Sequence, residues 1–349
     1  MTDPASFQEK FAAAAAANRS LLCVGLDPDP ERLPISDVAA FNREIIEATK
    51  DLVCAYKPNM AFYEALGGNG FAALAQTVKD IPPNIAILGD AKRGDVPNTA
   101  AAYARAMYDV WGFDAVTVNP YLGFDAVEPF LRPGKTAFLL CRTSNPGAGD
   151  FQDVAVAADG RPFYEAVARE AAGRSKAGNL GLVVGATYPE EAKAIRKLAP
   201  ELTILVPGLG PQGGELEAAV AANLDRRGAG ALFNASRQVL YASDGKDFGE
   251  AARAVAIELR DAINAVRDDQ VVRRQVKAPM DLRPGDRLRL KNNHACGGDE
   301  WTITRIGADI GLRCENCGRH ILLDRVKVER RIVSFLERAE AKEEQPASP

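Results

Sequence analysis

Oppositely charged side chains alternate in the first third of the sequence. Lys57 follows one short apolar run, and Asp90, Lys92 and Asp95 follow the next. On a strand, Asp90 and Lys92 point to the same face because they lie two residues apart. An alternating row of carboxylates and ammonium groups keeps every member ionised. Such a row suits the stabilisation of a carbanion by an ammonium group that then donates a proton. It suits a metal ion less well, because the lysines compete with the cation for the carboxylates.

Other polar residues and glycine-rich segments also follow apolar runs. These additional candidates for a substrate site are Asp27, Thr99, Asn119, Thr143, Ser144, Pro207, Gly208, Gln212 and Arg237. The glycines of residues 208–214 let backbone N–H groups approach phosphate oxygens, and Arg237 offers a bidentate donor. These two segments together predict a phosphate site.

Eight short apolar runs rich in β-formers occupy the first 265 residues, namely 21–25, 53–56, 85–88, 115–118, 137–141, 180–184, 203–206 and 230–233. Stretches with helical spacing separate them, among them 37–50, 99–111, 163–175 and 189–198. Eight strand–helix units in about 250 residues predict an α/β fold, a closed (β/α)8 TIM barrel. An open, doubly wound sheet is the alternative. In a barrel the polar residues meet at the C-terminal ends of the strands, and residues 145–161 form a loop or lid.

The composition changes near residue 269, which predicts two domains. The first 269 residues carry a net charge of −8 and the remainder +4. We expect a barrel over 1–268, a linker over 269–280, a small mainly-β domain over 281–339 and a disordered tail over 340–349. Strands are expected within 282–290, 310–313 and 320–323.

The apolar segments and the cysteines indicate in which cellular compartment the protein works. No apolar run is long enough for a membrane span, and residues 12–17 fit a helix better than a signal peptide. Cys23, Cys54 and Cys141 lie in apolar runs and are expected to be buried free thiols. The sequence therefore predicts a cytoplasmic protein without membrane contact.

His294, Cys296, Cys314 and Cys317 have a spacing that can form a tetrahedral structural zinc site, from which a small domain with a thin core would gain stability. His320 is an alternative fourth ligand, and three free cysteines are the alternative to any site. Basic residues on the expected strands invite a nucleic-acid hypothesis, but the small net charge argues against it.

Residues 90–99 read DAKRGDVPNT, residues 22–28 read LCVGLDP and residues 56–59 read YKPN. With VPG at 206–208 and Ser236-Arg237, these segments resemble the orotidine 5′-phosphate decarboxylase family. Residues 141–146 and 212–214 are similar to its bacterial type 2 branch, and the resemblance covers about residues 5–265. Trp301 and residues 307–310, with the cysteines, resemble a family of short uncharacterised bacterial proteins.

The first resemblance implies decarboxylation to UMP in pyrimidine biosynthesis without a cofactor. By this resemblance Asp90 lies against the substrate carboxylate, and Lys92 stabilises and protonates the C6 carbanion. Lys57 and Asp95 complete the charged row. The remaining implied contacts are Asp27 with ribose, Ser144 with the pyrimidine, and Gln212 and Arg237 with the phosphate. A homodimer is also implied, with Asp95 and Thr99 reaching into the partner's site.

Two alternatives remain. The magnesium-dependent hexulose-phosphate synthase group shares the fold and the D-x-K-x-x-D motif, but typically has an acidic residue where this chain has Lys57. A non-catalytic nucleotide-binding regulator is the other alternative, although such a protein would not need all four charges. One departure from the decarboxylase pattern is Asn234, which stands where many relatives have glycine.

Overall fold

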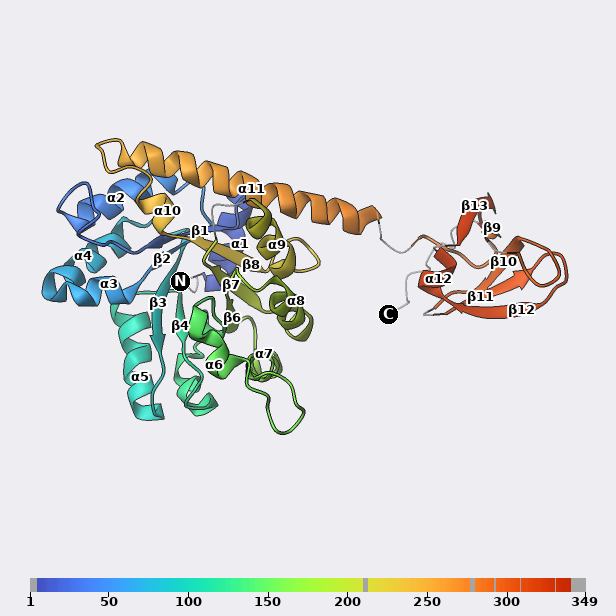
Figure 1. Ribbon diagram of the computed structural model, residues 1–349, viewed down its shortest axis with the longest axis horizontal. Helices are drawn as coiled ribbons and strands as arrows, with labels where there is room; N and C mark the ends of the chain where they lie inside the picture. The colour runs from blue at the N-terminus through green and yellow to red at the C-terminus, as the bar shows by residue number, and fades with distance from the viewer. Residues whose placement is uncertain are drawn as a thin grey trace, which may run out of the picture. The chain divides into compact units, whose positions relative to one another are not determined.

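Eight parallel strands close into a barrel, in which β1 pairs with β2 on one side and with β8 on the other. They are β1 (Leu22–Leu26), β2 (Ala55–Pro58), β3 (Ala86–Arg93), β4 (Ala115–Val118), β5 (Thr136–Arg142), β6 (Leu180–Val184), β7 (Thr203–Pro207) and β8 (Ala231–Ala235). Helices surround these strands in the computed structural model (Figure 1). The predicted (β/α)8 barrel is confirmed, and the open sheet is excluded.

The structure describes residues 5–209, 213–276, 280–291, 293–307, 309–329 and 331–339. The chain divides into two compact units, Met1–Arg273 and Arg274–Pro349, and each has its own hydrophobic core. Among the described residues, no helix combines the length and the apolarity that crossing a lipid bilayer requires.

The helices of the first unit precede β1, lie between successive strands and follow β8. They are α1 (Phe7–Ala17), α2 (Val38–Thr49), α3 (Met60–Ala65), α4 (Gly67–Asp80), α5 (Pro97–Arg105), α6 (Gly149–Gln152), α7 (Phe163–Arg174), α8 (Pro189–Leu198), α9 (Gly213–Asn223), α10 (Arg237–Leu240) and α11 (Phe248–Val276). A π-helical turn, Ala106–Val110, extends α5, and 3₁₀ turns lie at Phe124–Ala126, Glu128–Phe130 and Pro146–Ala148. The expected loop at 145–161 therefore contains one of these 3₁₀ turns and α6.

Helix α1 begins with a capping box. The Ser6 hydroxyl accepts the N–H of Glu9, and the Glu9 carboxylate accepts the N–H of Ser6 at 2.7 Å. Phe7 and Phe11 are buried, and the ring of Phe7 meets Phe138 of β5 edge to face at 5.5 Å. These contacts fix the helix against the barrel, so the segment at 12–17 belongs to the folded unit.

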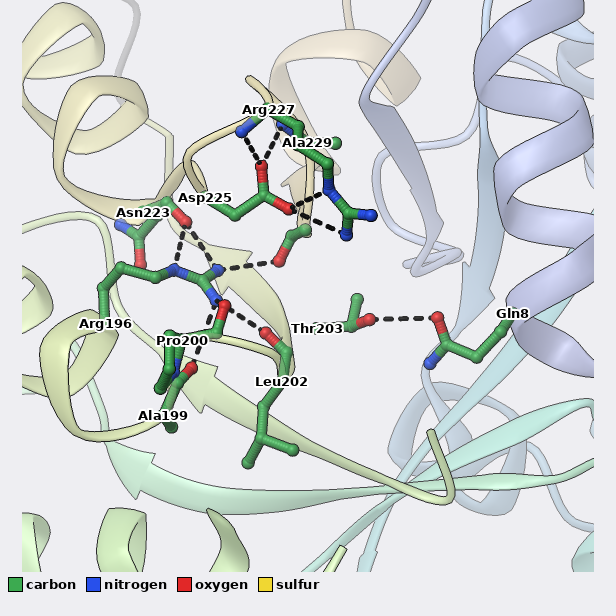
Figure 2. Close-up of polar contacts among 11 residues, drawn as sticks. Gln8, Arg196, Ala199, Pro200, Leu202, Thr203, Asn223, Asp225, Arg227 and Ala229 are labelled. Atoms are coloured by element: carbon green, nitrogen blue, oxygen red, sulfur yellow. Dashed lines mark hydrogen bonds and ion pairs between the residues drawn. The ribbon is translucent and has the colours of Figure 1, made fainter. Parts of the chain in front are cut away.

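One partly buried guanidinium joins the segments that lead into β7 and β8. Arg196 of α8 donates hydrogen bonds to the backbone carbonyls of Leu202, Asn223 and Gly230 at 2.6–2.9 Å (Figure 2). Figure 2 also shows further bonds to Ala199 and Pro200. Because a guanidinium presents five N–H donors in a fixed plane, one side chain satisfies carbonyls from several loop segments. These bonds fix the N-terminal ends of the two strands whose opposite ends carry the expected phosphate loops.

The second unit is a five-stranded antiparallel sheet in the order β12-β11-β10-β9-β13. Its elements are β9 (Arg287–Leu290), β10 (Glu300–Arg305), β11 (Asp309–Cys314), β12 (His320–Asp324), α12 (Arg325–Glu329) and β13 (Ile332–Glu337). Alternate residues point inward, so Leu288, Trp301, Ile303, Ile310 and Leu312 form a small core. This sheet confirms the predicted mainly-β region.

The sequence prediction was wrong about the linker and missed two strands. Helix α11 continues to Val276, because neither glycine nor proline interrupts it before Pro279 and Gln270 donates to the carbonyl of Ala221 at 3.0 Å. Strand β10 was missed because apolar and polar residues alternate over only a few positions there, which gives a weak strand signal. Strand β13 was missed because register shifts in its pairing with β9 break the alternation. Residues 277–279 and the predicted tail at 340–349 lie outside the described residues.

Candidate functional site

The Asp90 carboxylate lies at the centre of the charged row. One of its oxygens, Oδ2, accepts a hydrogen bond from Lys57 Nζ at 2.9 Å, and the other, Oδ1, accepts one from Lys92 Nζ at 2.6 Å. Lys57 is 2% exposed and comes from β2, whereas Asp90 and Lys92 come from β3. The structure therefore brings together three of the four predicted row members. Both oxygens of the buried carboxylate are occupied by ammonium groups, which leaves it poorly suited to a metal ion.

The charges in this row shift the pKa values of its buried members. Burial by itself would raise the pKa of Asp90, but Lys57 and Lys92 outweigh burial and hold that pKa well below its usual range. Burial would lower the pKa of Lys57, but Asp90 and Asp27 outweigh it and raise that pKa above its usual value. Asp90 and Lys57 therefore stay ionised at neutral pH.

Sequence reasoning missed Thr117 of β4, which is 1% exposed. Its hydroxyl donates to Asp90 Oδ1 at 2.9 Å and accepts the backbone N–H of Lys92 at 2.9 Å. Lys92 has φ +49°, and the pairing of β3 with β4 shifts register between Gly89 and Arg93. The alternation of residues 115–118 could have placed Thr117 inside the barrel, but not beside Asp90.

Asp27 extends the row beyond β1. Its carboxylate lies 3.9 Å from Lys57 Nζ, and its Oδ1 is buried without a hydrogen-bond partner in the described part of the chain. Tyr241 holds the adjoining backbone, because its hydroxyl donates to the Asp27 carbonyl and accepts the N–H of Asp29, both at 2.8 Å. Arg32 covers the Tyr241 ring at 3.9 Å. A fixed carboxylate with a free buried oxygen can accept a hydroxyl donor.

Ser144 and Gly208 lie side by side after β5 and β7. A Cβ added to Gly208 would lie 3.4 Å from Ser144 Oγ, and one added to Gly185 would lie 2.7 Å from Ser144 Cβ. Gly208 has φ +85°, a conformation that favours glycine. Pro207 ends β7 directly before it. The structure thus brings two predicted substrate contacts together, while Gln212 lies outside the described residues.

Arg237 begins α10 after β8, and its side chain is exposed. Asn234, which departs from the family pattern, is buried in β8, where its Nδ2 donates to Ser236 Oγ at 3.2 Å. Ser236 in turn lies against β1, since a Cβ on Gly25 would come within 2.0 Å of Ser236 Oγ. An asparagine at 234 therefore fits the barrel by orienting Ser236.

Asp95 and Thr99 do not join the row within one chain. Asp95 Oδ1 accepts the N–H of Val96 at 2.7 Å, and the Thr99 hydroxyl donates to Asn98 Oδ1 at 3.4 Å. Asn119 likewise makes a local bond, accepting the N–H of Tyr121 at 3.0 Å. No ion pair of Asp95 within 4.0 Å is found in the described ranges. Within one chain Asp95 therefore stands apart from the row, and its expected place in the partner's site stays a prediction.

In the second unit, His294, Cys296, Cys314 and Cys317 bring one ligand atom each to within 4.8 Å of one another. His294 Nδ1 lies 3.1 Å from Cys296 Sγ and 3.4 Å from Cys317 Sγ, and Cys296 Sγ lies 3.7 Å from Cys314 Sγ. His320 pairs with Arg313 at the start of β12 and is not part of this group. The structure thereby selects His294 as the fourth member.

The first unit defines a class of protein, a TIM-barrel enzyme with a lysine–aspartate row at the mouth. Comparison with known proteins defines its family. The profile of the "Orotidine 5'-phosphate decarboxylase / HUMPS family" matches residues 20–254. A curated orotidine 5′-phosphate decarboxylase of Herpetosiphon aurantiacus is 54% identical over 72% of this chain and 95% of its own length. The one of Thermomicrobium roseum is 51% identical over 76% and 97%. The chain belongs to this family.

Solved structures agree with this family. The OMP decarboxylase of Leishmania donovani matches with a TM-score of 0.68 and 41% identity, over 75% of this chain and 99% of that protein. The profile of a "Bacterial protein of unknown function (DUF951)" matches residues 282–336. The chain thus joins a catalytic family to one without a described function.

The charged row predicts a pH-dependent loss of stability in Lys57→Met. We expect the free energy of unfolding of the barrel to fall by about 3 kcal/mol at pH 7, because Asp90 loses its buried partner. The pKa of Asp90 is lowered by folding, so its contribution is complete above about pH 5 and is lost as the pH falls through its folded pKa. The pKa of Lys57 is raised by folding, so the stability that Lys57 contributes is complete up to about pH 9. It is lost as the pH rises through the pKa of Lys57 in the folded protein.

Urea denaturation at a series of pH values measures this difference. The difference in unfolding free energy between wild type and Lys57→Met should be constant from about pH 5 to 9 and shrink under more acidic conditions. Lys50→Met is the matched control, since Lys50 forms an ion pair with exposed Glu47 and with no other acidic residue in the described ranges, and it should change stability by less than about 1 kcal/mol. A difference between wild type and Lys57→Met that grows with acidity would contradict the assignment.

Proposed function

We propose that this chain decarboxylates orotidine 5′-phosphate to UMP in pyrimidine biosynthesis, without a metal or cofactor in catalysis. The observation that carries the proposal is the buried Asp90 carboxylate between Lys57 and Lys92, in a barrel whose curated relatives are about 50% identical orotidine 5′-phosphate decarboxylases. Family membership alone does not exclude a magnesium-dependent hexulose-phosphate synthase. The matching profile covers these synthases together with the orotidine 5′-phosphate decarboxylases. The lysines on Asp90 and the named relatives favour the decarboxylase.

The reaction needs a group that stabilises and then protonates a carbanion. The bond between C6 and the carboxylate breaks, CO2 leaves, and the electron pair remains at C6. The Lys92 ammonium, with a side chain 52% exposed at the mouth, stabilises that pair and donates the proton, which it regains from water. Asp90 faces the substrate carboxylate, and Lys57 holds Asp90 from the buried side. These assignments rest on the row geometry and on the family resemblance.

The remaining site residues hold the substrate. Asp27 binds ribose hydroxyls through its free oxygen, and Ser144 binds the pyrimidine. Pro207, Gly208 and Arg237 contact the phosphate, and the family resemblance adds Gln212 to these contacts. Asn119 lines the mouth beyond β4. Binding energy from the phosphate can hold the substrate against the charged row, which is how remote contacts contribute to the rate.

Turnover of orotidine 5′-phosphate in the presence of EDTA tests this proposal. Wild type should form UMP rapidly, and Lys92→Ala should lose at least about 10³-fold in kcat, because the proton donor is gone. Lys79→Ala, a surface lysine of α4, is the control and should keep wild-type turnover. Turnover that requires added magnesium would indicate the phosphosugar alternative, and UMP binding without turnover would indicate a regulator.

We also propose a homodimer in which Asp95 and Thr99 complete the partner's site. Within one chain Asp95 is apart from the row, although it follows the same strand. Exposed apolar side chains stand in the segments after β3, β4 and β5, on the same side of the barrel as the row. They are Val96, Tyr121, Leu122, Phe151 and Val154. Exposed apolar side chains that gather around the mouth of a barrel are typical of a surface that another subunit covers.

Mixing two inactive variants tests the shared site. Lys92→Ala and Asp95→Ala should each be nearly inactive, whereas an equimolar mixture allowed to exchange subunits should recover about one quarter of wild-type activity. The reason is that half of the dimers are then mixed and each holds one intact site. Activity would stay at the level of the single variants if Asp95 acted within its own chain. Sedimentation of wild type checks the dimer separately.

For the second unit we propose a structural zinc ion held by His294, Cys296, Cys314 and Cys317. Zinc–sulfur bonds of about 2.3 Å give a tetrahedron with edges of about 3.8 Å, close to the 3.7 Å between Cys296 and Cys314. The ligands come from the β9–β10 loop, the end of β11 and the β11–β12 turn. The ion would join these loops beside a core of few apolar residues.

Metal analysis of the full chain tests this site. Wild type should hold about one zinc per chain. Cys314→Ser should lose the metal and the hydrogen-exchange protection of residues 287–337, while UMP formation stays within about twofold because all four ligands belong to the second unit. Cys54→Ser, a buried barrel cysteine, is the control and should keep its zinc. Wild type that takes up no zinc after reduction and zinc addition would overturn the proposal.

We further propose a cytoplasmic protein that does not use this unit to bind nucleic acid. Cys23, Cys54 and Cys141 are buried free thiols, which suits a reducing compartment. On the open face of the sheet, Arg287 and Arg289 pair with Glu300 at 3.5 and 2.9 Å. Such neutralised arginines are poor phosphate ligands.

A further inference from the structure

We infer that the Thr117 hydroxyl is a positioning group for the decarboxylation, because it fixes the backbone of Lys92 relative to the Asp90 carboxylate. The inference rests on the proposed function and adds a residue outside the charged motif. Thr117 contributes no charge and lies on β4, whereas Asp90 and Lys92 lie on β3. Its role is therefore to hold the reacting lysine in place.

The direction of the hydrogen bonds determines what the hydroxyl does. It accepts the N–H of Lys92 at 2.9 Å, so its single proton is free to go to Asp90 Oδ1 at 2.9 Å. The chain of donors runs from the Lys92 backbone through Thr117 to the carboxylate. A serine can make both bonds, whereas a valine of similar shape can make neither.

The backbone of Lys92 needs such support. Its φ of +49° lies in the left-handed region, which strains a residue with a side chain. The register shift between Gly89 and Arg93 interrupts the regular pairing of β3 with β4 at this point. A side-chain acceptor for the Lys92 N–H replaces the missing ladder partner. Thr117 is itself fixed, because it is 1% exposed and lies within β4.

Misplacing the ammonium group by a fraction of an ångström would affect the reacting carbon but not the phosphate contacts. We expect Thr117→Val to lower kcat by about 10- to 100-fold. The KM and the inhibition constant of UMP should stay within about threefold, since UMP lacks the carboxylate. Thr117→Ser should return kcat to within about threefold of wild type.

The experiment compares these variants as full chains after their thermal melting has been measured. Thr203→Val is the matched control, because Thr203 is also buried and donates from a strand, to Gln8 Oε1 at 3.0 Å (Figure 2), but at the start of β7. It should keep wild-type kcat. If Thr117→Val is insoluble, Thr117→Ala takes its place with the same expectation.

Hydrogen exchange at the Lys92 amide gives a readout that needs no activity. It should become at least about tenfold faster in Thr117→Val and not in Thr203→Val. Unchanged exchange and unchanged kcat would overturn the inference, as would equal losses in kcat and UMP affinity, which indicate general distortion. A wild type that does not decarboxylate would count against the proposed function, while the exchange measurement would still decide whether Thr117 holds Lys92.

Discussion

The buried carboxylate of Asp90 is the constraint around which this barrel is arranged. A carboxylate that is 9% exposed would protonate unless cations compensated for its lost hydration. Lys57, Lys92 and Thr117 supply that compensation from three adjacent strands, β2, β3 and β4. Since each donor reaches the carboxylate only from its own place in the sheet, the ionisation of Asp90 depends on how these three strands pair.

The N-terminal end of the barrel carries contacts that stabilise the fold, and the C-terminal end carries the candidate site. At the N-terminal ends of the strands, Arg196 satisfies backbone carbonyls from several segments, and α1 packs its phenylalanines against β5. At the C-terminal ends, Lys92 and Gly208 have left-handed backbone conformations. One oxygen of Asp27 has no hydrogen-bond partner among the described residues. At the C-terminal ends, where the candidate site lies, such strained or unsatisfied groups are ones that a substrate can use.

The second unit is stabilised on a different principle. Its core consists of a few apolar residues on one face of a sheet, and the other face carries arginines paired with acidic residues. Four potential ligand atoms, from the β9–β10 loop, the end of β11 and the β11–β12 turn, come together in this unit. The unit therefore relies on local convergence of side chains, whereas the barrel relies on the closure of its sheet.

The sequence by itself determined the strands of the barrel and most of the polar residues at their ends. Buried parallel strands are nearly continuous apolar runs, and a closed barrel gathers the residues at their C-terminal ends around one mouth. Only the tertiary structure decided which of those residues meet. It placed Thr117 beside Asp90 and separated Asp95 from the row, since both depend on a register shift and a turn that alternation does not encode. It also selected His294 over His320. Distances across strands and loops are set by packing, which a one-dimensional pattern does not contain.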